Sequence, residues 1–127
     1  MTKTQTPIYE LVETEKQPAR FAWAIQVDGK EIGAVGINLE DTDELESPAV
    51  HVAIEDANPR GSEIEIAVLK DMISYAYRNI PSEHLYSRYE TSSLMGDKLL
   101  KQLGFEKDGD PYVDDDGLKW QNVVLVV

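Results

Sequence analysis

The chain has 127 residues, of which 42% are hydrophobic and 28% are charged. This size fits a single domain over residues 1–127, with residues 1–7 expected to be frayed, and the apolar content excludes intrinsic disorder. Acidic residues outnumber Lys and Arg by 24 to 12, and the net charge of -12 argues against binding to nucleic acid or to anionic membranes.

Disulfides, thiol nucleophiles and thiolate metal sites are excluded because the chain contains no cysteine. The longest strongly apolar run, "NVVLVV" at the C-terminus, is too short to span a bilayer. The first residues do not show the signal-peptide pattern of a basic region followed by an apolar stretch, so we expect a cytoplasmic location.

The first half of the chain shows strand patterns. Alternating or continuous apolar residues predict strands over residues 8–14, 20–27, 32–39 and 49–55. Asp28-Gly29 lies between the second and third of these and is a favoured hairpin turn, because glycine adopts positive φ without steric cost. An antiparallel run of strands is therefore expected.

The second half contains two predicted helices. Apolar residues spaced by three or four predict an amphipathic helix over residues 62–79, which Pro81 ends. A strand over 84–90 and a shorter helix over 93–103 follow, with Gly104 as a left-handed cap. Closing strands are expected over 105–113 and 118–127.

The element order predicts an α/β (α+β) fold with a mixed, mostly antiparallel sheet and two helices in the C-terminal half. The strands on either side of the long helix must be parallel, because a helix crossover joins them. Ligands in such sheets bind where neighbouring strands diverge at their carboxyl ends. In this chain that position is the end of the strand over 49–55.

Three local motifs resemble those of the GNAT superfamily of acetyl-CoA-dependent N-acetyltransferases, especially the branch that modifies ribosomal-protein N-terminal amines. The segment 60–65, Arg-Gly-Ser-Glu-Ile-Glu, lies where that family has a [QR]-x-x-G-x-[GA] loop. Ser93-x-x-Gly96 before Leu103-Gly104-Phe105 is similar to the family's N-x-x-S before Leu-Gly-Phe, and the ending "DGLKWQNVVLVV" is similar to its final hairpin.

The resemblance implies that acetyl-CoA is the cofactor. In the family, backbone N–H groups at the helix start bind the pyrophosphate, which is sound because unpaired amides and the positive dipole end converge there. A backbone N–H at a bulge in the fourth strand contacts the acetyl carbonyl. The residues implied to bind the cofactor are Val52, Ala53, Ile54, Arg60, Gly61, Ser62, Glu63, Ile64, Glu65, Ser93 and Gly96.

Three departures from the family pattern bear on activity. Glu63 and Glu65 replace small residues, Leu100 stands where a tyrosine acid is often found, and only "EKQPA" separates the first two strands in place of two helices. The acceptor site is therefore expected to be open, or completed by a second subunit in a homodimer.

The two carboxylates have opposite effects on the helix and on an anion. Ser62-x-x-Glu65 is a capping box, which stabilises the helix start by about 1 kcal/mol. Like charges 4 to 6 Å apart repel by about 3 to 4 kcal/mol at an effective dielectric of 20. Mobility and salt screening lower that value, but the sequence predicts weakened cofactor binding.

Amide formation from a thioester requires a base for the amine and an acid for the leaving thiolate. Glu55 is the candidate base, with His51 on the same strand, and Ser93 is the candidate acid or a cofactor contact. Solvated surface is the alternative for Glu55, and helix capping is the alternative for Ser93. His51 and His84 lack metal-ligand spacing, and the acidic turn "DGDPYVDDDG" lacks calcium-loop spacing, so no metal is expected.

Two functions are supported by features of the sequence, and a third, binding of a different small ligand between the fourth and fifth strands, has no feature in its favour. The first is direct transfer of an acetyl group from acetyl-CoA to a small amine or a peptide N-terminus. The alternative is a non-catalytic protein-binding module that keeps the GNAT fold and has lost cofactor binding.

Overall fold

The computed structural model describes residues 9–17, 20–42, 45–54 and 61–126, with the backbone alone for 15–17, 20, 61 and 62. Its elements are, in chain order, β1 (Glu10–Gln17), β2 (Arg20–Val27), β3 (Lys30–Asn38), β4 (Ala49–Ile54), α1 (Gly61–Asn79), β5 (His84–Glu90), α2 (Met95–Asp97), the π-helical segment η1 (Lys98–Gln102), β6 (Glu106–Lys107), β7 (Tyr112–Val113) and β8 (Lys119–Val126).

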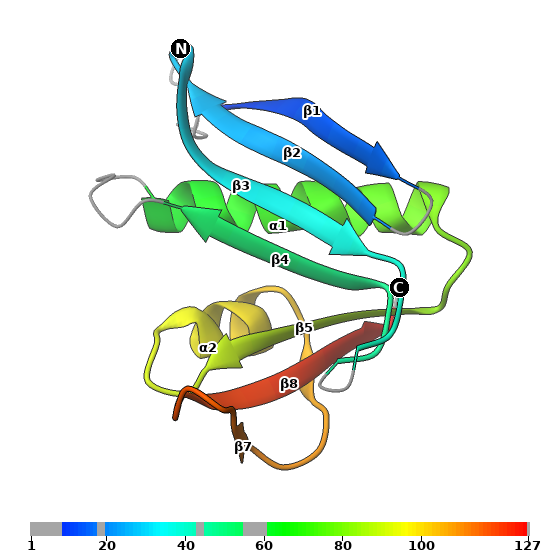
Figure 1. Ribbon diagram of the computed structural model, residues 1–127, viewed down its shortest axis with the longest axis vertical. Helices are drawn as coiled ribbons and strands as arrows, with labels where there is room; N and C mark the ends of the chain where they lie inside the picture. The colour runs from blue at the N-terminus through cyan, green and yellow to red at the C-terminus, as the bar shows by residue number, and fades with distance from the viewer. Residues whose placement is uncertain (1–8, 18–19, 43–44, 55–60, 127) are drawn as a thin grey trace, which may run out of the picture.

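The strands form one mixed sheet in the order β1-β2-β3-β4-β5-β8-β6, with β7 also paired to β8 (Figure 1). β1 to β4 are antiparallel neighbours, and β4 and β5 are parallel because α1 connects them. The predicted α+β class, the mostly antiparallel sheet and the parallel crossover are thus confirmed.

The hairpins of the first half follow from local chemistry. Asp28 and Gly29 have φ values of 52° and 79°, which confirms the predicted tight turn between β2 and β3. β1 ends at Gln17 and β2 begins at Arg20, so the two strands form a hairpin with no helix between them. β1 lies further along the chain than the predicted 8–14.

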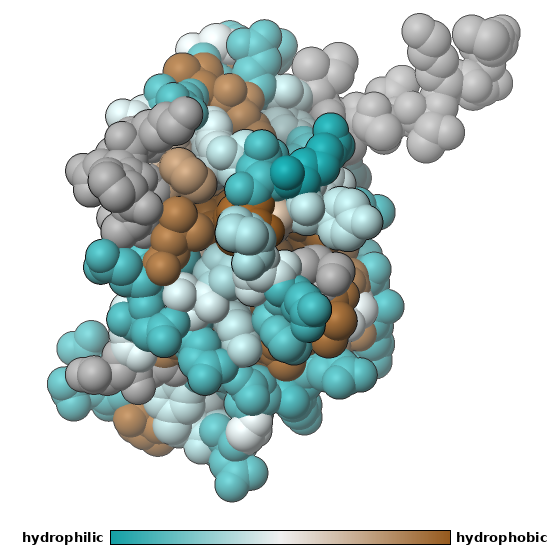
Figure 2. Space-filling model, turned by 90° about the vertical axis from the view of Figure 1, so that its right-hand side faces the viewer, coloured by the Kyte–Doolittle hydropathy of each residue, from teal (hydrophilic) through white to brown (hydrophobic). Residues whose placement is uncertain are grey.

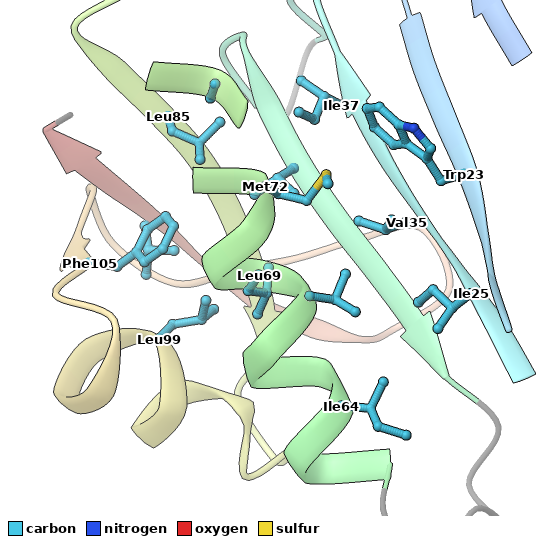
Figure 3. Packing of buried hydrophobic residues seen from close by; sticks show 14 of the residues in the cluster. Trp23, Ile25, Val35, Ile37, Ile64, Leu69, Met72, Leu85, Leu99 and Phe105 are labelled. Carbon is cyan, nitrogen blue, oxygen red and sulfur yellow. The ribbon is translucent and has the colours of Figure 1, made fainter. Parts of the chain in front are cut away.

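The core lies between α1 and the sheet (Figure 3). The predicted apolar stripe of α1 is confirmed, since its side chains are at most 3% exposed at Ile64, Val68, Leu69, Met72 and Ala76. The sheet contributes its own buried residues, among them Ile25, Val35, Ile37 and Leu85. Full burial of each such side chain stabilises the fold by about 1.5 to 3 kcal/mol.

Aromatic rings extend this core toward the far end of α1. The Trp23 and Tyr75 rings meet edge to face at 5.2 Å, and Phe21 packs on the same tyrosine at 6.0 Å. β2 therefore anchors the last turns of α1 through these rings.

The second helix differs from the prediction of a regular helix over 93–103. A single α-helical turn, α2, leads into η1, where the N–H of Leu103 donates to the carbonyl of Lys98. Serines and Gly96 are weak helix formers, which shortens the regular part. Gly104 has a φ of 83° and ends the segment as predicted.

The predicted strand over 105–113 is wrong as one element. It is split into β6 and β7, which pair with opposite ends of β8, at Val124 and Trp120 respectively. Gly109 has a φ of 78°, and Pro111 cannot donate to a ladder, so the chain turns between the two short strands.

The pairing of β4 with β5 is short. Within the described residues these strands share one backbone pair, Ala49 with Tyr86, where the Tyr86 N–H donates to the Pro48 carbonyl at 2.8 Å. One residue further on, the buried Ser87 hydroxyl donates to the Val50 carbonyl at 2.8 Å. A side chain thus joins the strands at the point where they begin to diverge.

Replacing Ser87 by alanine should therefore destabilise the strand junction. Loss of a buried hydrogen-bond donor should lower the free energy of unfolding by about 1 to 3 kcal/mol, measured by urea denaturation. Ser74→Ala, at an exposed position of α1, is the matched control and should change stability by less than about 0.5 kcal/mol. Equal effects of the two substitutions would contradict a role for Ser87 at the junction.

Candidate functional site

The carboxyl ends of β4 and β5 point to the same end of the molecule, where α1 begins and α2 lies (Figure 1). This is the arrangement that the sequence predicted for a ligand site. Four consecutive elements, β4, α1, β5 and α2, therefore contribute residues to one region.

The candidate base Glu55 and the candidate phosphate contact Arg60 lie outside the residues that the structure describes. Gly61 and Ser62 are described by their backbone and form the first turn of α1. The side chain of Ser62 is not described, so the capping box with Glu65 stays a prediction.

Glu65 has a charged partner that the sequence analysis did not identify. Its Oε1 accepts a hydrogen bond from Lys98 Nζ at 3.0 Å, and the two side chains are 21% and 16% exposed, respectively. Glu63 is exposed in the first turn of the same helix. The expectation of two uncompensated carboxylates is corrected, because Glu65 forms an ion pair with Lys98.

Lys98 was missed because its partner is 33 residues away in the sequence. The usual signal for such a pair is an oppositely charged residue three or four positions away on one helix. This ion pair joins α1 to η1, so only the packing of the two helices creates it.

The backbone of Val52, Ala53 and Ile54 lies at the end of β4. β3 and β4 keep one register throughout, from Asn38–Ala49 to Gly33–Ile54, so the bulge that the resemblance implied is not present in these residues. A Cβ on Gly33 would lie 2.2 Å from the Ala53 carbonyl oxygen. Glycine therefore allows β3 to run close against the end of β4, and the ladder continues without a bulge.

Ser93 forms a local hydrogen bond, since its Oγ accepts from the Met95 N–H at 3.2 Å. The hydroxyl is exposed, and this bond is of the capping type that the sequence analysis gave as its alternative role. Leu100, at the position of the family's tyrosine, packs against the hydrophobic core.

Gly96 is buried beneath the ring of Tyr89, the penultimate residue of β5. A Cβ on Gly96 would lie 2.7 Å from the Tyr89 ring, which is closer than real contacts allow. The glycine that replaces the family's serine is thus explained by the aromatic ring packed on it.

On the opposite face of the sheet from α1, His51 and Ala53 are exposed. The His51 ring lies over Gly36 of β3, where an added Cβ would be 3.1 Å from Nε2. Ala49 pairs with Tyr86, and alternation along each strand therefore puts His51 and Glu90 on this same face.

Glu90 is a candidate base that sequence reasoning missed. It ends β5, is half-buried, and its Oε1 accepts from the Ser92 hydroxyl at 3.0 Å. Alternation in "HLYSRYE" places Glu90 on the opposite face of the strand from the buried Leu85 and Ser87. This pattern was present in the sequence.

Next to Glu90, aromatic and polar side chains hold β5, β7 and β8 together. The Arg88 guanidinium stacks on Trp120 at 4.0 Å and donates to the Tyr112 hydroxyl, which donates to Asn122 at 2.8 Å. The Trp120 indole N–H donates to Asp114 at 2.7 Å and holds the pKa of that carboxyl below its usual value.

The acidic turn after β7 is therefore a hydrogen-bonded hairpin end. Asp114 also accepts from the backbone N–H groups of Asp116 and Leu118. Among the residues that the structure describes, no cluster of three or more His, Asp or Glu side chains could hold a metal ion. No described helix is long and apolar enough to cross a membrane.

A shallow pocket of about 250 Å³ lies at the other end of α1. It is lined by Ile73, Ser74, Tyr77, Arg78, Leu125 and Val126. Tyr77 and Val126 are more than 70% exposed. Figure 2 shows a mostly hydrophilic surface with separate hydrophobic patches. The pocket is remote from Glu65 and Gly96, so it is not part of the candidate site.

Gly96→Ala should clash with Tyr89 and lower stability by about 1 to 3 kcal/mol in urea denaturation. In a Tyr89→Ala background the same substitution should cost much less, because the ring is gone. A double-mutant cycle measures this difference, and an interaction energy near zero would show that the two residues are not in contact.

No protein-family model matches the chain, and no curated protein sequence matches it. Solved structures share its fold. The aminoglycoside acetyltransferase AAC(6')-Ib, in complex with coenzyme A, is 16% identical, with a TM-score of 0.65 over 87% of this chain and 68% of its own. Mycobacterium smegmatis RimJ, in complex with CoA-disulfide, is 16% identical, with a TM-score of 0.68 over 86% of this chain and 54% of its own.

A third similar structure is a Salmonella typhimurium acetyl transferase that modifies the N-terminal serine of a 50S ribosomal subunit protein. It is 8% identical, with a TM-score of 0.64 over 87% of this chain and 65% of its own. These likenesses show that the chain has the fold of the GNAT acetyltransferases, as the sequence resemblance implied.

Proposed function

We propose that this protein is an acetyl-CoA-dependent N-acetyltransferase that transfers the acetyl group directly to a small amine or to a peptide N-terminus. The observation that carries the proposal is the divergence of β4 and β5 beside the start of α1, in a fold shared with enzymes crystallised with coenzyme A. A negative net charge suits a cationic acceptor.

The residues around the start of α1 fit a diphosphate in their donor chemistry. Backbone N–H groups in the first turn of a helix are unpaired and carry the positive end of its dipole. Lys98 adds a shielded ammonium next to Glu65. Together these groups would hold the cofactor by its pyrophosphate, and the bound cofactor supplies the acetyl thioester.

The other steps belong to side chains and backbone at the strand ends. Glu90 or Glu55 takes the proton from the acceptor amine, so that its nitrogen can attack the acetyl carbon. Backbone N–H groups at the end of β4, within residues 52–54, would donate to the acetyl carbonyl oxygen. Ser93 is the candidate from the sequence that would pass a proton, through water, to the sulfur that leaves when the acetyl group moves to the amine.

The alternative is a non-catalytic protein-binding module with this fold. The Glu65–Lys98 ion pair favours it, because the pair connects the two helices between which a cofactor would lie. Leu100, which has no proton to donate, favours it also. A second copy that completes the acceptor wall fits either function, since β1 and β2 form a plain hairpin.

Titration with acetyl-CoA, followed by backbone amide chemical shifts, separates the two functions. Shifts concentrated at residues 54–66 and 90–97, saturating below about 1 mM, are the result expected for an enzyme, since KM values usually lie below that concentration. The absence of any shift at several millimolar cofactor would leave the binding module as the function.

Glu90→Gln should lower kcat/KM for acetyl transfer by about 10²- to 10⁴-fold, the usual contribution of a general base. Binding of coenzyme A, measured by calorimetry, should stay within about twofold, because the side chain lies on the sheet face opposite to α1. Glu40→Gln, at an exposed loop position, is the charge-matched control. Full activity of Glu90→Gln would assign the base to another residue, with Glu55 next.

A further inference from the structure

The Glu65–Lys98 ion pair lies between the two elements that the proposed function assigns to the cofactor. Glu65 is in the second turn of α1, just after the amides of the first turn, and Lys98 follows Gly96 and Asp97 at the start of η1. Both charged groups are largely shielded from solvent. An anion bound at the start of α1 would therefore approach the same ammonium that Glu65 holds.

Of the two lysines that the structure describes in ion pairs here, Lys98 and Lys101, Lys98 is the one shielded from solvent. Lys101 pairs with Asp97 at 3.6 Å, but both side chains are more than 70% exposed, so that pair is screened by water. Glu63 adds a negative charge in the first turn of α1. A diphosphate in this region gains more from the shielded ammonium than from the exposed one, because Coulomb interactions strengthen as the local dielectric falls.

We infer that Lys98 is a cofactor-binding residue that contacts the diphosphate, and that the Glu65 carboxylate competes with the diphosphate for the same ammonium. This inference rests on the proposed function. Lys98 exchanges one anionic partner for another when the ligand binds, and Glu65 then swings toward solvent. The ligand class is a diphosphate ester, because a ligand without an anionic group could not replace the Glu65 carboxylate as the partner of Lys98.

Calorimetric titration of the wild-type protein and its Glu65→Gln variant with coenzyme A tests the competition. Removing the carboxylate charge should tighten binding by about tenfold, because the ionised Glu65 side chain no longer competes with the diphosphate for the Lys98 ammonium. Glu63→Gln removes the same charge from the same helix without touching the pair, and its effect should stay within about threefold. Inorganic pyrophosphate should bind the wild-type protein and the two variants in the same order of affinity, but more weakly than coenzyme A does.

The role of Lys98 itself is tested in the Glu65→Gln background, where no carboxylate is left buried without its partner. Adding Lys98→Met should reverse the gain in coenzyme A affinity, by about tenfold or more. Adding Lys101→Met, an exposed position in the same segment, should change affinity by less than about threefold. Thermal unfolding of each variant verifies that it is folded, and the Glu65→Gln gain should shrink as salt is raised.

Each outcome is decisive. If Glu65→Gln and Glu63→Gln have equal effects, or if Lys98→Met leaves the Glu65→Gln affinity unchanged, the inference is overturned while cofactor binding, and with it the proposed function, stands. If neither the wild-type protein nor Glu65→Gln binds coenzyme A at millimolar concentration, both the proposed function and the inference fail.

Discussion

The short contact between β4 and β5 is the constraint on which the candidate site depends. The two strands are joined at Ala49 and Tyr86 and by the Ser87 side chain, and further along, up to Ile54 where the described part of β4 ends, their backbones do not pair. Because a parallel pair needs a crossover, α1 must start near the free end of β4. The same divergence leaves the end of β5 to carry α2, so that both helices meet beside the opened sheet.

Within this frame, the Glu65–Lys98 pair balances a charge that would otherwise oppose an anion. Partly buried ions must lose hydration, and only a well-placed partner compensates for that loss. The pair therefore has two effects in one place. It joins α1 to η1, and it keeps a carboxylate close to the helix start where a pyrophosphate is proposed to bind.

Two departures from the family pattern coincide with packing contacts. Gly96 lacks a side chain because the Tyr89 ring occupies its space, and Leu100 contributes to the core. Gly33, which no motif indicated, allows β3 to lie against the Ala53 carbonyl, and it shapes the backbone proposed to contact the acetyl group.

Sequence alone was sufficient for the parts of the structure that local chemistry controls. The Asp28-Gly29 turn, the apolar stripe of α1, the Gly104 cap and the mixed sheet all follow from short-range patterns and the crossover rule. The split into β6 and β7 was missed, because only the pairing with β8 shows where each short strand ends.

The sequence indicated where the candidate site would lie, but it did not indicate which charged side chains pair there. The sequence indicated the start of α1 and the segment 93–96, but it showed Glu65 without Lys98 and Gly96 without Tyr89. Residues 33 positions apart meet only after α1 and η1 have packed, and no local pattern encodes that distance. The sequence by itself determined the fold and predicted where a ligand site would lie, whereas the tertiary structure alone decided which charges and rings face one another there.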